Sequence, residues 1–312
     1  MLRYMTHRLL GTAIVLLGIS AITFTLMHAI PGGPWDREGL TAAKDPAIVT
    51  DISEHYGLDK PLWEQYGQLL WNLLHGDLGI SYVYGDRGVT AIILDGLPAT
   101  LTLAAIALGL ALIVGISLGT LSALKQNTWI DHLGTILSTS LVSVPGFVVG
   151  IALMLIFAVS FDLLPAAGWG SPQHVVLPAL ALAAFPTALI ARVTRASVLD
   201  TLHQDHVRTA RAKGLSERAI LFQHVLRNAL IPILTITGPE WAFLVSGSII
   251  IETLFAVPGI GRLFVDGVFD RDYGLIMGGT MFYAFAITTT NLIVDILYAI
   301  VDPRIRYAQE TS

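Results

Sequence analysis

The sequence predicts an all-α integral membrane protein with six transmembrane helices. Apolar residues make up 54% of the 312 residues and charged residues only 13%, about half the roughly 25% charge of soluble domains. The mean hydropathy is +0.68. The apolar residues form six blocks of 21 to 27 residues, each long enough to cross about 30 Å of hydrocarbon at 1.5 Å per residue.

The first block covers residues 9–29 and follows a positively charged start that could be mistaken for a secretory signal. It is longer than the 7–15 apolar residues typical of a cleaved signal. It ends in Ile30-Pro31-Gly32-Gly33-Pro34, without a small-residue cleavage pattern. We therefore expect residues 1–30 to form an N-terminal tip and a retained transmembrane helix.

Residues 31–96 are polar and rich in Gly, Pro, Asp, Trp and Tyr. A segment of this length is too long for a simple connection. We expect it to fold as a small extracytoplasmic domain between the first two transmembrane helices.

Five further blocks lie within a transmembrane core that we place at residues 97–303, followed by a tail at 304–312. They cover residues 98–124, 133–158, 175–195, 229–254 and 276–301. Prolines inside them require that neighbouring groups satisfy the freed backbone atoms. Glycine pairs at four-residue spacing favour close helix packing within the subunit, with packing between subunits as the alternative. These pairs are Gly115/Gly119, Gly146/Gly150 and Gly274/Gly278.

The distribution of Lys and Arg predicts the orientation. With six helices both termini lie on one side, and that side carries twelve of the 18 basic residues. Four of the remaining six fall in the long 31–96 segment, which counts weakly. We expect both termini in the cytoplasm.

The cytoplasmic segment 196–228 predicts a helical hairpin. Lys213 suits the carboxyl end of a first short helix, and Gly214 can take the left-handed conformation that ends it. Ser216 can cap a second helix. Ala219, Phe222, Leu226 and Ala229 recur at helical spacing and predict its apolar face.

The same segment carries a family resemblance. Arg208-Thr209-Ala210, three further residues and Gly214 resemble the Glu-Ala-Ala-x-x-x-Gly loop of bacterial ABC-importer permeases. Arg208 replaces the usual Glu, and Arg227 stands where many relatives have Pro. Both departures resemble the oligopeptide/dipeptide branch. A basic loop that follows the positive-inside rule, or a helix-turn-helix, is the alternative interpretation of this segment.

Shorter motifs of the same branch occur in order along nearly the whole chain. They are Pro31-Gly-Gly-Pro34, Tyr56-Gly-Leu-Asp-Lys-Pro-Leu62, Gly76-Asp-Leu-Gly79, Leu97-Pro-Ala-Thr-Leu-Thr-Leu103, Arg192-x-x-Arg195, Phe255-Ala-Val-Pro-Gly-Ile-Gly261, Arg271-Asp-Tyr273 and Asp302-Pro-Arg304. Each motif alone is weak, but their order is specific.

The resemblance implies a type I ABC-importer permease fold in the bacterial inner membrane. It implies a homologous second permease, two ATPase subunits that hold ATP and Mg, and an extracytoplasmic solute-binding protein as partners. Peptide is the expected substrate, with nickel, glutathione or oligosaccharide as alternatives. The expected ATPase-coupling residues are Arg208, Thr209, Ala210, Gly214, Leu215 and Ser216.

No catalytic, cofactor or metal site is expected in this chain. It has no cysteine, and none of its four lysines follows a glycine, so a Gly-x-x-x-x-Gly-Lys phosphate loop is impossible. Basic runs with interleaved aromatic residues are lacking, which argues against nucleic acid. His203 and His206 lack a third ligand, and no nucleophile–base set is visible.

Polar residues within the blocks are candidates for a translocation pathway. We select Glu240, Trp241 and Asn291, whereas Glu252 and Asp295 lie near block ends and are expected to make structural hydrogen bonds. An ion-driven secondary transporter is the first alternative class, and the hairpin and the scarcity of intramembrane charge argue against it. An intramembrane enzyme is the second, and it would need the catalytic set that the sequence lacks.

Overall fold

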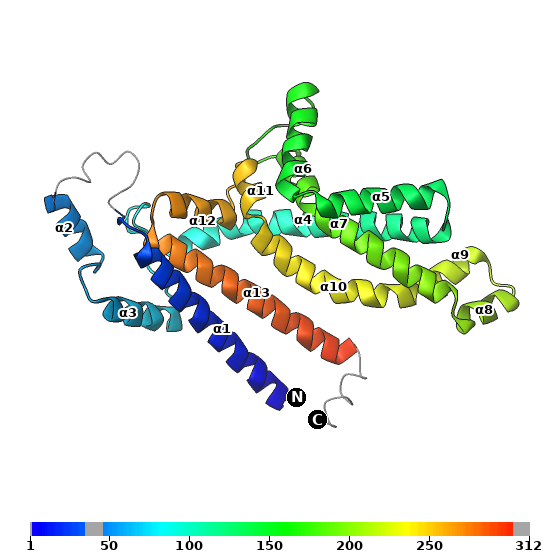
Figure 1. The fold of residues 1–312 in the computed structure, drawn as a ribbon, viewed down its shortest axis with the longest axis horizontal. Coiled ribbons are helices and arrows are strands. Elements are labelled where there is room, and N and C mark those ends of the chain that lie inside the picture. The colour runs from blue at the N-terminus through cyan, green and yellow to red at the C-terminus, as the bar shows by residue number, and fades with distance from the viewer. Residues whose placement is uncertain (1, 35–45, 302–312) are drawn as a thin grey trace. The chain divides into compact units, whose positions relative to one another are not determined.

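The computed structural model describes residues 2–34 and 46–301, and the helices of this part of the chain are shown in Figure 1. The expected tail at 304–312 lies outside the described residues. The helices are α1 (Leu2–Ala29), α2 (Pro46–His55), α3 (Leu62–Leu74), α4 (Val89–Leu124), α5 (Trp129–Ser143), α6 (Gly146–Leu153), the π-helical segment η2 (Met154–Ser160), α7 (Pro172–Leu202), α8 (Asp205–Ala212), α9 (Glu217–Ala219), the π-helical segment η3 (Ile220–Val225), α10 (Leu226–Gly247), α11 (Ile249–Leu254), α12 (Ile260–Phe269) and α13 (Tyr273–Val301).

Five helical runs among the described residues are long and apolar enough to cross a membrane. They are Arg8–Ala29, Val89–Leu124, Pro172–Leu202, Glu217–Leu254 and Tyr273–Ile293. A sixth span is made only if the bent pair Trp129–Ser143 and Gly146–Ser160 counts as one. The prediction of six transmembrane helices is confirmed in this sense.

The block expected over residues 133–158 is a bent pair of helices, and the bend falls at Pro145-Gly146, inside the block. The chain bends by 106° between α5 and α6. Val144 has extended torsion angles of −97° and 124°, and Pro145 then begins the next helix. Proline disfavours the helical conformation of the residue before it, so the break is encoded locally by Val144-Pro145.

The chain divides into two compact units, and each is described here by itself. The first comprises Met1–Thr100 and Pro258–Leu292, and the second comprises Leu101–Val257 and Ile293–Ser312. The long helices α4 and α13 contribute to both units.

Helix α7 is the centre of the second unit, where it packs against α5, α6 and α10. A buried ion pair joins α5 to α7: Nε of Arg195 lies 2.6 Å from one oxygen of Asp131, and Nη2 lies 2.8 Å from the other. Helix α4 approaches α7 closely, since a Cβ on Gly115 would come within 2.9 Å of Ile190. A Cβ on Gly119 would meet the carbonyl of Ala191.

In the first unit the start of α13 is fixed by the buried carboxylate of Asp272. It accepts hydrogen bonds from the hydroxyl of Ser81, the amide of Tyr82 at 3.1 Å and the amide of Leu275 at 3.0 Å.

Gly274 and Gly278 lie against the segment around Ile80 and Leu78. With Gly150 against Leu254, each of the three glycine pairs makes close contacts within the subunit, as expected.

Candidate functional site

The segment between α7 and α10 forms the expected helical hairpin, and its turn is built by local hydrogen bonds. Gly214 has a φ of +79°, and its amide donates to the carbonyl of Arg211 at 2.9 Å. The hydroxyl of Ser216 accepts from the amide of Ala219 at 3.3 Å and caps α9. The predictions for Gly214 and Ser216 are confirmed, because both effects depend only on residues close in sequence.

An ion pair closes the hairpin across this turn. Nε of Arg211 lies 3.1 Å from Oε1 of Glu217, and Nη2 lies 3.4 Å from Oε2. Arg211 is in the last turn of α8 and Glu217 is in the first turn of α9, where each charge also suits the local helix dipole. The pair is exposed to solvent, so it adds at most about 1 kcal/mol to the packing of the two short helices.

The hairpin has a hydrophobic core of its own that is continuous with the ends of the transmembrane helices. Val207 and Ala210 of α8 pack with Ile220, Val225 and Ala229 of the second arm. Ala123 of α4 and Val198 of α7 complete the cluster. The hairpin is thus anchored to the membrane core rather than suspended by two flexible connections.

The packing of this core differs from the sequence-based expectations for two residues. Ala210 was expected on the ATPase-contacting surface, but it is buried within the hairpin. Phe222 was expected on the packed face, but it is 67% exposed. The π-helical segment Ile220–Val225 shifts the spacing of the buried positions from that of a regular α-helix, so Ile220 and Val225 point inward instead.

The outer surface of the hairpin is polar and positively charged. Arg208, Thr209, Gly214 and Ser216 are exposed, whereas Leu215 is half-buried. The side chain of Arg208 is 76% exposed and lies 3.6 Å from Asp205. Further exposed basic residues are Arg211, Lys213 and Arg218. Five of the six expected coupling residues therefore lie wholly or partly at this surface.

The three pathway candidates do not form one described site. Glu240 and Trp241 lie on α10 of the second unit, and Asn291 lies on α13 within the part assigned to the first. Glu240 is only 7% exposed, and its Oε2 has no hydrogen-bond partner among the described residues. Asn291 is exposed. Glu252 instead accepts a 2.6 Å hydrogen bond from Ser248, the structural role expected for it.

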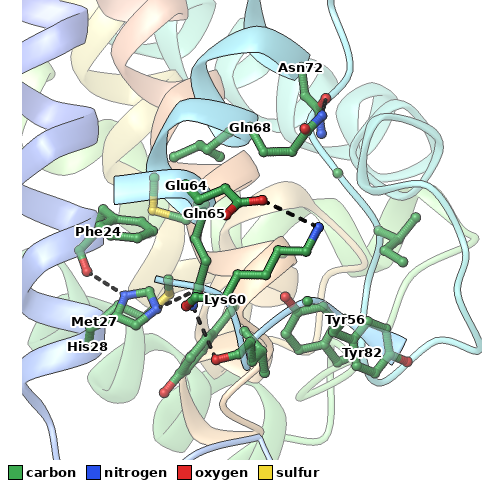
Figure 2. Close-up of a pocket in the computed structure, with 18 of the residues that line it drawn as sticks. Phe24, Met27, His28, Tyr56, Lys60, Glu64, Gln65, Gln68, Asn72 and Tyr82 are labelled. Atoms are coloured by element: carbon green, nitrogen blue, oxygen red, sulfur yellow. Dashed lines mark hydrogen bonds and ion pairs between the residues drawn. The ribbon is translucent and has the colours of Figure 1, made fainter. Parts of the chain in front are cut away.

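A pocket of about 250 Å³ in the first unit was not anticipated from the sequence (Figure 2). Its walls come from α1, α3, the Tyr56–Lys60 and Leu78–Tyr82 segments and the start of α13. Ring contacts connect Phe24 to His28, His28 to Tyr273, and Tyr273 to Tyr82. The abundance of aromatic residues in 31–96 was the available signal, but their convergence depends on long-range packing.

The rim of this pocket carries polar groups with defined partners. His28 Nε2 lies 3.2 Å from Gln65 Oε1, and Gln65 donates to the carbonyl of Lys60 at 2.8 Å. The hydroxyl of Tyr56 donates to Asp86 at 2.7 Å. Partial burial, followed by this hydrogen bond, raises the pKa of Tyr56 to about 12. Each of these polar side chains has a hydrogen-bond partner, which fixes the geometry of the rim.

No group of three or more His, Asp and Glu side chains that could hold a metal ion occurs in residues 2–34 and 46–301.

Comparisons with known proteins agree with this architecture. Residues 115–307 match the family model of the binding-protein-dependent transport system inner membrane component. Residues 1–104 match the N-terminal model of the same membrane component. Together the two models cover most of the chain.

Curated relatives are similar over almost their whole length. The chain is 40% identical over 306 residues to the dipeptide transport system permease protein DppB of Bacillus subtilis, covering 98% of each chain. It is 40% identical over 309 residues to the oligopeptide transport system permease protein OppB of Salmonella typhimurium, covering 98% of this chain and 100% of the relative. Identity to the glutathione transport system permease protein GsiC of Pectobacterium atrosepticum is 41% over 307 residues.

Solved structures share the fold at low identity. The MetNI methionine ABC transporter, in inward-facing conformations, matches with a TM-score of 0.58 and 15% identity, covering 68% of this chain and 96% of that one. An amino acid ABC transporter solved with histidines matches with a TM-score of 0.55 and 17% identity, covering 68% and 95%. The chain has the ABC-importer permease fold and belongs to the family of inner membrane components of binding-protein-dependent transport systems.

Proposed function

We propose that this chain is the permease subunit of an ATP-driven peptide importer and that the hairpin at 196–228 couples it to ATP hydrolysis. The observation that carries the coupling role is the construction of the hairpin. It has a buried core continuous with Ala123 and Val198, a closed turn and an exposed basic surface. Such a rigid projection can receive a displacement from a partner and pass it to the helices that anchor it.

The connections to the spans support this mechanical role. The second arm belongs to the continuous helical run Glu217–Leu254. The first arm, α8, is separated from α7 only by His203 and Gln204. A movement at the tip would therefore displace the ends of two spans together, with little slack in the connections.

The energy source is assigned to other chains. We infer two ATPase subunits that hold ATP and Mg, a homologous second permease and an extracytoplasmic solute-binding protein. This chain itself is then non-catalytic. The purified chain, free of ATPase subunits, should show no ATP turnover with or without peptide, and measurable turnover would contradict this assignment.

Peptides are the proposed substrates because the relatives at 40% identity are named dipeptide and oligopeptide permeases. Glutathione is the second candidate, because GsiC is equally similar at 41%. Uptake of radiolabelled dipeptide, longer peptide and glutathione into cells expressing the complete transporter would rank them. Failure of all three, with uptake of nickel or an oligosaccharide, would overturn the peptide assignment.

Charge reversal tests the coupling surface without disturbing the hairpin core. The double variant Lys213→Glu, Arg218→Glu changes only exposed side chains and should lower co-purification of the ATPase subunits and peptide uptake together. Lys125→Glu is the matched control, since it reverses one exposed charge in the loop between α4 and α5. Full ATPase binding and uptake by the double variant would exclude this surface as the contact.

A further inference from the structure

Helix α3 has its apolar residues on the outside. No residue of α3 is buried, and Trp63, Trp71 and Leu74 are 76%, 61% and 82% exposed. At about 100° per residue, the aromatic and aliphatic residues of one face span half of the circumference. These residues are Leu62, Trp63, Tyr66, Leu70, Trp71, Leu73 and Leu74.

The opposite face of α3 is polar and lines the pocket of the first unit. Figure 2 shows Glu64, Gln65, Gln68 and Asn72 on the pocket side. Gln68 donates to Asn72 at 2.8 Å, and Lys60 lies 4.0 Å from Glu64. Water can reach these groups through the open pocket. The helix therefore turns its polar face to the pocket, whereas Trp63, Trp71 and Leu74 of its apolar face are exposed.

The position of α3 relative to the first transmembrane helix is fixed by direct contacts. The hydroxyl groups of Tyr66 and Ser20 lie 2.9 Å apart, and the rings of Tyr66 and Phe24 are 5.2 Å apart. A groove between the two helices is lined by Ala21, Phe24, Thr25, Leu62, Trp63 and Tyr66, together with His28 and Ala29. Figure 1 shows α3 alongside α1.

These contacts place α3 beside the carboxyl-terminal part of α1. Ser20 precedes the last residue of α1, Ala29, by nine residues, which is about 13 Å along a helix axis. The contacts of α3 thus fall on the last two to three turns of a membrane-spanning helix. Interfacial helices bury their apolar face about 5–10 Å into the boundary between headgroups and acyl chains.

We propose that α3 is an interfacial helix whose Trp63–Trp71–Leu74 face inserts into the lipid leaflet at the carboxyl end of α1. Lipid fits this face better than a protein partner, because the face is uncharged along its whole length. It also carries two tryptophans, which are enriched at the membrane–water boundary. The polar face, with Glu64 paired to Lys60, remains in water on the pocket side.

Nitroxide labels on single cysteines test this placement, and the chain has no native cysteine to remove. The full-length chain would be reconstituted in nanodiscs of phosphatidylcholine and phosphatidylglycerol. Labels in Trp63→Cys and Leu74→Cys should collide preferentially with oxygen. Labels in the matched variants Glu64→Cys and Gln68→Cys should collide preferentially with a water-soluble nickel chelate. The oxygen-to-nickel collision ratio should therefore be several-fold higher at positions 63 and 74 than at positions 64 and 68.

Two outcomes would overturn the proposal. Equal nickel accessibility at all four positions would place the apolar face in water. Protection of positions 63 and 74 from both reagents would show that protein covers the face. A second measurement guards against misfolded cysteine variants. The double variant Trp63→Phe, Trp71→Phe keeps the face apolar and removes two of the six tryptophans. It should lose the part of the tryptophan quenching by headgroup-brominated lipids that these two residues contribute. Unchanged quenching would also refute insertion.

Discussion

Buried carboxylates show how single residues hold this fold together. Asp131, Glu252 and Asp272 are nearly or fully inaccessible to solvent. Asp131 is paired with Arg195, Glu252 with the hydroxyl of Ser248, and Asp272 with backbone amides and Ser81. Burying a charge without a partner is very unfavourable. Asp131 and Asp272 therefore each identify two distant segments that must meet, which hydropathy alone does not reveal, whereas the partner of Glu252 is only four residues away.

The ion pair between α5 and α7 gives a stability prediction. Arg195→Met keeps much of the apolar stem but leaves Asp131 buried without its cation, so the variant should be destabilised by about 3 kcal/mol. Unfolding of the purified chain in detergent by denaturant would measure this loss. The matched control, Arg262→Met, removes the cation of an exposed pair with Asp266, and should change stability by less than about 1 kcal/mol. Equal effects of the two substitutions would contradict the assigned importance of the buried pair.

Elements of this chain are shaped by positions where the backbone, rather than a side chain, determines the geometry. Val144-Pro145 breaks a long apolar block into α5 and α6. Gly214 ends α8 in a left-handed conformation, and the space around it is open. Gly119 instead permits α4 to touch the backbone of α7. The same residue type therefore serves a turn in one element and close packing in another.

Gly214 allows the geometry of the hairpin to be changed without altering its core. Alanine at a φ of +79° should introduce about 1–2 kcal/mol of backbone strain, and Gly214→Pro should be more disruptive because proline fixes φ near −65°. Membrane abundance should stay normal while ATPase co-purification and uptake fall, most strongly for proline. Gly170→Ala is the control, with a φ of +117° and equally open space in the loop before α7. Normal uptake by both Gly214 variants would exclude a coupling role for the turn.

Gly119 gives the corresponding prediction for helix packing. In Gly119→Ala the new methyl group would meet the carbonyl of Ala191 and the side chain of Thr194, and such overpacking typically destabilises by about 1–3 kcal/mol. Gly109→Ala lies on the same helix with nothing within 4 Å, so it should be neutral or stabilising by up to about 1 kcal/mol. Thermal unfolding of both variants in detergent would test the close approach of α4 and α7. Similar unfolding temperatures would show that the helices are not in contact.

At the scale of the whole molecule, the chain is a multi-pass membrane protein of two compact units rather than a single continuous bundle. Long helices contribute to both units, whereas the hairpin belongs to the second and the aromatic pocket to the first. The hairpin and the aromatic pocket are therefore supported by separate hydrophobic clusters. A destabilising substitution in one cluster should leave the local packing of the other cluster intact.

The excess of basic residues around the hairpin predicts the topology of these surfaces. A cysteine at position 60 should react with an impermeant maleimide in intact cells, and a cysteine at position 213 should react only after permeabilisation. Both native side chains are exposed, so burial would not confound the comparison. The reverse pattern would invert the proposed orientation, with 31–96 inside and 196–228 outside.

The sequence alone determined the class of the protein, its apolar blocks and the turn of its hairpin. These features depend on composition or on interactions between residues close along the chain, such as Ser216 with Ala219. Only the tertiary structure decided that Ala210 packs inward, that Phe222 points outward and that Arg195 meets Asp131. It also decided that α3 turns its polar face to a pocket and its apolar face outward. Those outcomes depend on contacts between distant segments and on a local π-helical shift, neither of which α-helical periodicity encodes.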